Sequence, residues 1–182
     1  MASSGLLTTG VAFHQIDLLS ERGLTATAAA ANFLPQTAAG IAATLLVGFL
    51  IDRYSPRFMI VSAMAGLAAG LAWATVVTPG WSAIGFGLVI GAAANAARAI
   101  EAASTPRLFG TAHLGSIRAV VSALNIGSTA FGPLAFATVR DVTGSYAFAL
   151  LGGILLPVAV AIAALLTPLP SAVAARRRSE SG

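Results

Sequence analysis

The sequence predicts an all-α membrane protein in which six transmembrane helices fill almost the whole chain. Of its 182 residues, 57% are hydrophobic and only 9% are charged, whereas a soluble domain carries about a quarter charged residues. The mean hydropathy is +0.88. Apolar runs of about 20 residues recur along the chain, and this length crosses about 30 Å of hydrocarbon as an α-helix.

The first three predicted helices are apolar runs that end at polar or Pro-Gly turns. Residues 5–19 form the first, and a polar turn at 20–23 follows it. Residues 28–51 form the second, which stops at a charged Asp-Arg pair. Residues 57–77 form the third, and a Pro-Gly step ends it because neither residue continues a helix well.

The last three predicted helices follow the same pattern. They span residues 81–104, 116–139 and 146–166. A proline and a polar loop follow the fourth, and a charged pair followed by a glycine ends the fifth. The remaining residues, 169–182, are rich in Pro, Ser and Arg and are predicted to form a disordered cytoplasmic tail.

The predicted first helix is short. Fifteen or so residues reach only about 22 Å, less than the thickness of the hydrocarbon. We therefore expect the natural protein to extend upstream of Met1. The alternative is a tilted short helix that thins the bilayer around it.

The arginines predict the orientation in the membrane. One set of loops and the tail holds seven of them: Arg53, Arg57, Arg107, Arg118, Arg176, Arg177 and Arg178. The opposite set holds only Arg22 and Arg140. Basic residues concentrate on the cytoplasmic side, so both termini are expected to be cytoplasmic in a multi-pass protein of the plasma (inner) membrane. On this topology, Trp81 and Tyr146 are expected at the outer interface.

Polar residues inside the predicted helices give the candidate site. Such residues are costly in lipid and usually face protein or a water-filled cavity. The candidates for a substrate or proton pathway are His14, Asp17, Asn32, Gln36, Asn95, Arg98, Asn125 and Thr129. They lie on the first, second, fourth and fifth helices, whereas the third and sixth are almost wholly apolar. This order predicts two inverted three-helix repeats with the third and sixth helices facing lipid.

Two motifs carry a family resemblance. Residues 48–57 resemble the loop motif G-x-x-x-D-R-x-G-x-R of the major facilitator superfamily, with Gly48, Asp52, Arg53 and Arg57 matching and Ser55 in place of the second glycine. The chain as a whole resembles the C-terminal half, helices 7–12, of such a transporter. A Gly-Pro break followed by a D-x-T-G-S-Y turn resembles the bacterial monocarboxylate-type and oxalate/formate-type members.

The resemblance implies a secondary active transporter, a symporter or antiporter, that moves a small solute by alternating access. The solute is expected to be an organic anion. The partners implied are the lipid bilayer, a small-molecule substrate with a co-transported proton, and a missing N-terminal six-helix half. No cofactor, metal or nucleic acid is expected, although the sequence pI is near 11.1, because the basic residues lie in loops and the tail.

Each candidate has a functional and a structural interpretation. His14 and Asp17 are either a proton-coupling pair or part of a water-exposed helix end. Arg98 either binds an anionic substrate or pairs with Glu101 to close the cytoplasmic side. Asn32, Gln36 and the other neutral candidates either line the cavity or make interhelical hydrogen bonds.

A conformational latch and a hinge complete the predicted machinery. The latch comprises Gly48, Asp52, Arg53, Arg57 and Glu101, and its alternative is a charged loop that only sets topology. The hinge is Gly132 and Pro133, because proline kinks a helix.

Other functions fit the sequence less well. An intramembrane enzyme using His14 or His113 with a serine lacks any G-x-S-x-G or H-E-x-x-H motif, so no catalytic residue is expected. The absence of cysteine excludes thiol chemistry. Two alternatives within transport remain, namely a drug or metabolite efflux carrier of the same superfamily and a half-size protein acting as a homodimer.

Overall fold

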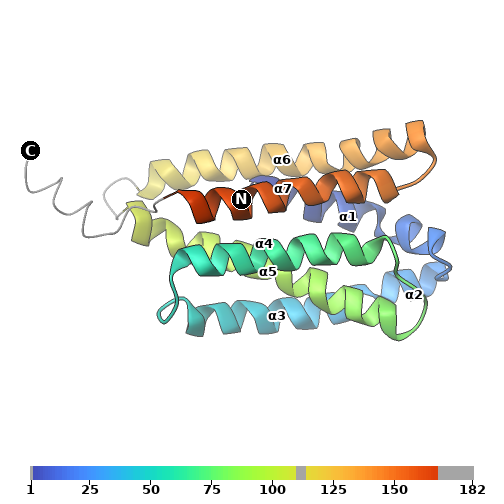
Figure 1. The fold of residues 1–182 in the computed structure, drawn as a ribbon, viewed down its shortest axis with the longest axis horizontal. Coiled ribbons are helices and arrows are strands. Elements are labelled where there is room, and N and C mark those ends of the chain that lie inside the picture. Colours follow the sequence, from blue (N-terminus) through green and yellow to red (C-terminus); the bar gives the residue numbers. More distant parts are fainter. Residues whose placement is uncertain (1, 110–113, 168–182) are drawn as a thin grey trace, which may run out of the picture.

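The computed structural model of the protein describes residues 2–109 and 114–167. Seven α-helices make up the regular structure of this part: α1 (Ala2–Glu21), α2 (Ala26–Ala31), α3 (Phe33–Leu50), α4 (Pro56–Ala74), α5 (Trp81–Phe109), α6 (Leu114–Thr143) and α7 (Ala147–Leu166). The long helices lie side by side and the chain reverses between them (Figure 1). The predicted all-α class is confirmed.

The helices α2 and α3 are two parts of one bent span, Ala26–Leu50. The bend lies at Asn32, which separates them. Pro35 explains it, because proline has no N–H to donate to the carbonyl four residues earlier and its ring crowds that carbonyl. With α2 and α3 counted together, the described chain forms six rods, and five of them are long and apolar enough to cross a membrane.

The first helix is the exception, and it corrects a prediction. It contains 20 residues, from Ala2 to Glu21, and not only residues 5–19. Twenty residues reach about 30 Å, so the argument from a short first helix is wrong. The sequence prediction stopped at the polar residues near both ends. The strongly polar residues His14, Gln15 and Asp17 lie within α1 and lower its hydropathy, and α1 is not among the five apolar spans.

The other predicted boundaries differ by a few residues. The fourth predicted helix continues to Phe109 as α5, and the fifth extends in both directions as α6. Both extensions run into polar sequence, where apolarity no longer marks the helix. The predicted tail, 169–182, lies outside the described residues.

Helix pairs organise the bundle. The most extensive packing joins α3 to α5, α1 to α6, and α4 to both α7 and α5. A large buried apolar cluster joins α1, α4, α5 and α7, and a smaller one joins the ends of α3, α4 and α5 at Val47, Met59 and Ile100. These two clusters hold α4 and α5 at the centre of the described bundle.

The predicted lipid-facing role of the third helix can apply to only part of its surface. Its helix, α4, buries seven residues: Met59, Ala63, Met64, Leu67, Gly70, Leu71 and Ala74. The apolarity of this helix serves packing against α5 and α7. The last helix, α7, fits the prediction better, because its large apolar residues include exposed ones such as Leu151, Leu155 and Ile162.

Glycines set the closest helix crossings. A β-carbon on Gly132 of α6 would lie 2.2 Å from the carbonyl oxygen of Leu6 in α1. A β-carbon on Gly91 of α5 would lie 2.3 Å from the carbonyl oxygen of Gln36 in α3. No real side chain fits at those distances, so both helix pairs depend on glycine for their backbone contact.

Candidate functional site

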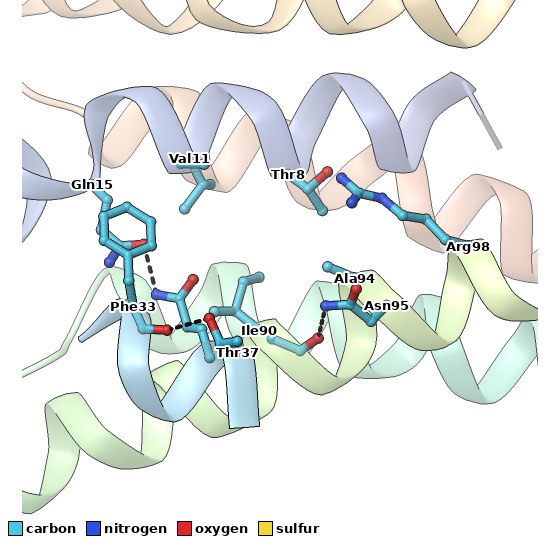
Figure 2. Close-up of a pocket in the computed structure, with 12 residues that line it drawn as sticks. Thr8, Val11, Gln15, Phe33, Thr37, Ile90, Ala94, Asn95 and Arg98 are labelled. Atoms are coloured by element: carbon cyan, nitrogen blue, oxygen red, sulfur yellow. Dashed lines mark hydrogen bonds between the residues drawn. The ribbon is translucent and has the colours of Figure 1, made fainter. Parts of the chain in front are cut away.

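A cavity of about 230 Å³ lies between α1, α3 and α5 (Figure 2). Its lining combines apolar walls with polar side chains. The lining residues are Thr8, Val11, Ala12, Gln15, Phe33, Gln36, Thr37, Ile90, Gly91, Ala94, Asn95 and Arg98. Three of the predicted candidates, Gln36, Asn95 and Arg98, are therefore brought together in one cavity.

A chain of side-chain amides closes one end of the cavity. The Nε2 group of Gln36 donates to Oε1 of Gln15 at 2.7 Å and to Oδ1 of Asn32 at 3.1 Å. Asn32 donates in turn to the carbonyl of Ala83 at 2.6 Å, and Gln15 donates to the carbonyl of Ala29 at 3.4 Å. These bonds join α1, the α2–α3 span and α5, as interhelical hydrogen bonds between amides commonly do in membranes.

Arg98 supplies the positive charge of the cavity. It is exposed, and its guanidinium reaches from α5 toward Thr8 of α1 (Figure 2). No ion pair joins Arg98 to Glu101, although the structure describes both residues. The Glu101 carboxylate accepts a hydrogen bond from Asn125 at 2.8 Å. Asn95 lies one turn before Arg98 and donates to the carbonyl of Gly91 at 2.9 Å.

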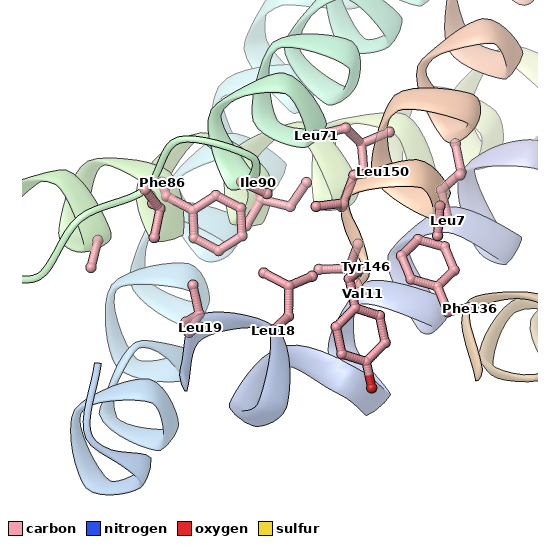
Figure 3. Close-up of a cluster of buried hydrophobic side chains, with 14 of the residues drawn as sticks. Leu7, Val11, Leu18, Leu19, Leu71, Phe86, Ile90, Phe136, Tyr146 and Leu150 are labelled. Atoms are coloured by element: carbon pink, nitrogen blue, oxygen red, sulfur yellow. The ribbon is translucent and has the colours of Figure 1, made fainter. Parts of the chain in front are cut away.

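His14 lies on a different side of α1 from the residues that line the cavity. Its Nε2 atom is 3.0 Å from the carbonyl oxygen of Pro133, and its Nδ1 atom is 3.0 Å from the hydroxyl of Tyr146. The ring also stacks on Phe136. Both aromatic residues belong to the buried apolar cluster shown in Figure 3. His14 thus fastens α1 to α6 and α7 and does not line the cavity.

Charged residues continue this contact at the end of α1. Arg140 lies 3.3 Å from Glu21 and 5.3 Å from the centre of the Tyr146 ring. Asp17 is exposed and does not line the cavity either. We call His14, Glu21, Arg140 and Tyr146 the α1–α6–α7 cluster. Tyr146 is buried within it at the N-terminal end of α7, and its place at the outer interface stays a prediction.

The fifth-helix candidates lie at the contact between α6 and the start of α1. A β-carbon on Gly5 would meet Thr129 at 3.4 Å and Asn125 at 3.7 Å. Asn125 also donates to Glu101, as described above, and the hydroxyl of Thr129 donates to the carbonyl of Ile126 in its own helix. Neither residue lines the cavity between α1, α3 and α5.

The predicted latch residues are dispersed. Gly48, Asp52 and Arg53 are exposed at the end of α3 and in the loop after it. Arg57 donates from the start of α4 to the carbonyl of Thr167, the C-cap residue of α7, at 2.5 Å. Glu101 lies on α5 and contacts α6. The structure places Arg57 as a tie between two helix ends, and the latch itself stays a prediction.

The predicted hinge residues lie inside one continuous helix, α6. Gly132 packs against the backbone of α1, and the carbonyl of Pro133 contacts His14. The segment is thus the closest crossing between α1 and α6, and hinge motion there stays a prediction.

Sequence reasoning missed Gln15, which is completely buried. The candidates chosen on the first helix were His14 and Asp17, and Gln15, which lies between them in the sequence, points to a different side of the helix. The sequence did indicate that Gln15 matters, because an amide within an apolar segment needs a hydrogen-bond partner on whichever side of the helix it lies. Thr8 lies on the same side of α1 as Gln15, seven residues earlier, and it also lines the cavity.

Comparisons with known proteins identify the family. The family model described as Major Facilitator Superfamily matches residues 1–182, the whole chain. No curated protein and no solved structure matched. The match covers the superfamily as a whole and does not favour a monocarboxylate or oxalate/formate branch. With its apolar spans, the chain is a multi-pass membrane protein that belongs to the Major Facilitator Superfamily.

Proposed function

We propose that the protein is a secondary active transporter that moves a small organic anion through the cavity between α1, α3 and α5. The observation that carries the proposal is Arg98, a cation that lines this cavity without a carboxylate partner among the described residues. An unpaired charge inside a membrane protein is expensive and usually serves binding or transport. Arginine suits carboxylates because its planar donors can bind both oxygens.

The packing order supports two inverted three-helix repeats. Two such repeats would relate α1 to α5, the α2–α3 span to α6, and α4 to α7. The contact of α1 with α6 then corresponds to the contact of α5 with α3. The contact of α4 with α7 maps onto itself, whereas the extensive contact of α4 with α5 has only a slight counterpart between α7 and α1. A two-fold axis in the membrane plane produces such a pattern, and repeats of this kind place substrate sites near the bilayer midplane.

A second six-helix unit is proposed as the partner that completes the pathway. The cavity opens beside exposed polar residues of α3 and α5, including Thr37 and Arg98, and a facing unit would enclose them. Alternating access would then proceed by rocking of the two units around this site. We also propose both termini on the cytoplasmic side of the plasma membrane, as the arginine distribution predicts.

Arg98→Ala tests the proposed function. Uptake of radiolabelled small carboxylates into proteoliposomes that contain the protein should fall by about 10-fold to 100-fold, because a charge-assisted hydrogen bond contributes about 1.5–3 kcal/mol. Arg98→Lys keeps the charge but not the bidentate geometry and should retain intermediate uptake.

The matched control is Arg22→Ala, which removes a loop arginine of the other end of the bundle. It should leave uptake near the original rate. Unchanged uptake in Arg98→Ala would exclude anion binding by Arg98, and would favour the alternative of an efflux carrier for neutral or cationic compounds.

Proton coupling through His14 and Asp17 stays a prediction. The position of His14 between α1, α6 and α7 supports a structural role in the contact between helices. A homodimer of half-size chains is the second alternative, and the exposed polar residues around the cavity would then meet their own copies.

A further inference from the structure

We infer that the cavity selects small carboxylates that also carry a hydrogen-bond donor, such as a hydroxyl group, at the end remote from the acid group. The inference rests on the proposed function and specifies its substrate class. Arg98 at one end of the cavity takes the carboxylate, and Gln36 at the other end accepts the donor. The orientation of the Gln36 side chain carries this inference.

Two backbone carbonyls fix the orientation of the three amides. A carbonyl oxygen can only accept a hydrogen bond. The atom of Gln15 that faces the carbonyl of Ala29 must therefore be Nε2, and the atom of Asn32 that faces the carbonyl of Ala83 must be Nδ2. Both of these side chains then turn their oxygen atoms toward Gln36.

Gln36 can therefore offer a ligand only a hydrogen-bond acceptor. Its Nε2 atom donates to the oxygen atoms of Gln15 and Asn32, so both of its N–H groups are used. Its Oε1 atom receives no hydrogen bond from any described residue. Because Gln36 lines the cavity, a bound molecule meets a hydrogen-bond acceptor at this end.

An acceptor of this kind discriminates between ligands. A ligand with a hydroxyl group satisfies the oxygen of Gln36, whereas a ligand with a methyl group displaces water and leaves that oxygen unpaired. A ligand with an ether oxygen brings a second acceptor and gains nothing. The site therefore distinguishes donors from isosteric groups that cannot donate.

The length of the cavity sets the spacing between the two groups. The backbone of Gln36 touches Gly91, and Arg98 follows Gly91 by seven residues, about 10 Å along α5. The guanidinium reaches across to α1 at this end (Figure 2). Val11, Ile90 and Ala94 form apolar walls between the ends, which suits a short unbranched methylene chain.

Three matched probes test the inference on the unmodified full chain in nanodiscs: 6-hydroxyhexanoate, hexanoate and 6-methoxyhexanoate. Ligand-dependent shifts of the thermal unfolding midpoint give the relative affinities. The hydroxy acid should bind about threefold to tenfold more tightly than either of the others, which is the range for one hydrogen bond to a neutral acceptor.

Two variants test whether Gln36 causes the preference for the hydroxy acid. Gln36→Leu should bring the three affinities together. Thr44→Val on the same helix should leave the preference intact, because the Thr44 hydroxyl bonds the carbonyl of Gly40 in its own helix and lies outside this cavity.

The outcomes separate this inference from the proposed function. Equal binding of the three probes that is lost in Arg98→Ala would overturn the donor inference and leave anion transport in place. Tightest binding of the methoxy acid would also overturn it. Failure of all three probes to bind would overturn both.

Discussion

Gln15 and His14 are neighbours in the sequence and point to different sides of α1. Gln15 points to the cavity and holds Gln36 in one orientation. His14 points to α6 and α7 and contacts Pro133 and Tyr146. Adjacent positions on a helix are about 100° apart, so a one-residue difference decides between a ligand site and a packing contact.

The tautomer of His14 follows from its partners. The Pro133 carbonyl can only accept, so Nε2 of His14 carries the hydrogen, and Nδ1 of the neutral ring accepts from the Tyr146 hydroxyl. A directed chain of hydrogen bonds therefore runs from α7 through α1 to α6. The carbonyl of Pro133 takes part in it, at the point where proline already interrupts the hydrogen bonds of α6.

Tyr146→Phe removes the first donor of this chain and keeps the aromatic ring. The free energy of unfolding should fall by about 0.6–1.7 kcal/mol, the average and the maximum measured for hydrogen bonds between the helices of a membrane protein. Chemical unfolding in mixed micelles measures it. Tyr54→Phe is the control, because Tyr54 is exposed and should show no loss. Equal losses in both variants would show that the hydroxyl of Tyr146 contributes nothing specific.

The stabilisation that Tyr146→Phe removes should depend on pH in a definite direction. Burial raises the pKa of the Tyr146 phenol above its ordinary value, and this outweighs the opposite effect of the Arg140 charge. The unfolded chain therefore loses this proton first as the pH rises, and the stabilisation is complete below about pH 10 and declines above it. The stability difference between the protein and Tyr146→Phe should shrink from about pH 10 upward.

At the scale of the helix, the sequence predicted the number of helices more accurately than the residues at which they begin and end. Six apolar runs located all six rods, because apolar length is a direct requirement of the hydrocarbon. The ends were less accurate, since α5 and α6 continue into polar sequence. The face of each helix was least predictable: α4 reads as apolar on every side, and only its neighbours α5 and α7 decide which residues are buried.

The candidate site shows the same limit. Gln36, Asn95 and Arg98 could be predicted because each is a polar residue inside an apolar helix and is costly in lipid. Gln15 could not be assigned to the cavity from the sequence, because its role depends on a contact with α3 across the bundle. Asn125 and Thr129 were predicted as candidates on the same ground, and they lie where α6 meets the start of α1.

Gly132→Ala tests the crossing of α1 and α6. The added methyl group would overlap the carbonyl of Leu6, and the helices would have to separate along a contact that also includes Gly10 and Phe136. Overpacking of this kind costs about 1–3 kcal/mol, to be read from chemical unfolding in mixed micelles.

Gly127→Ala in the same helix is the matched control. A β-carbon there meets nothing within 4 Å, so the substitution should be neutral or should stabilise the protein by up to about 1 kcal/mol through helix propensity. If both alanine variants behave alike, the close contact at Gly132 does not hold the two helices together.

At the scale of the whole molecule, two kinds of exposed surface need different surroundings. Large apolar residues cover the outer side of α7, including Leu155 at 70% exposure. The cavity side carries Thr37 of α3 and Arg98 of α5, both exposed and polar in character. A transporter half needs lipid on the first surface and water or a facing unit on the second.

Single cysteines distinguish these surroundings, because the sequence contains no cysteine. A charged thiol reagent that cannot enter lipid should modify Thr37→Cys readily in the membrane, since water reaches a transport cavity and allows the thiolate to form. Leu155→Cys should react roughly tenfold more slowly or not at all, because a thiol in hydrocarbon stays protonated and out of reach. Both should react alike after unfolding in detergent, which verifies that each cysteine is intact. Faster labelling of Leu155→Cys would place α7, and not the cavity between α1, α3 and α5, on the water-accessible side of the molecule.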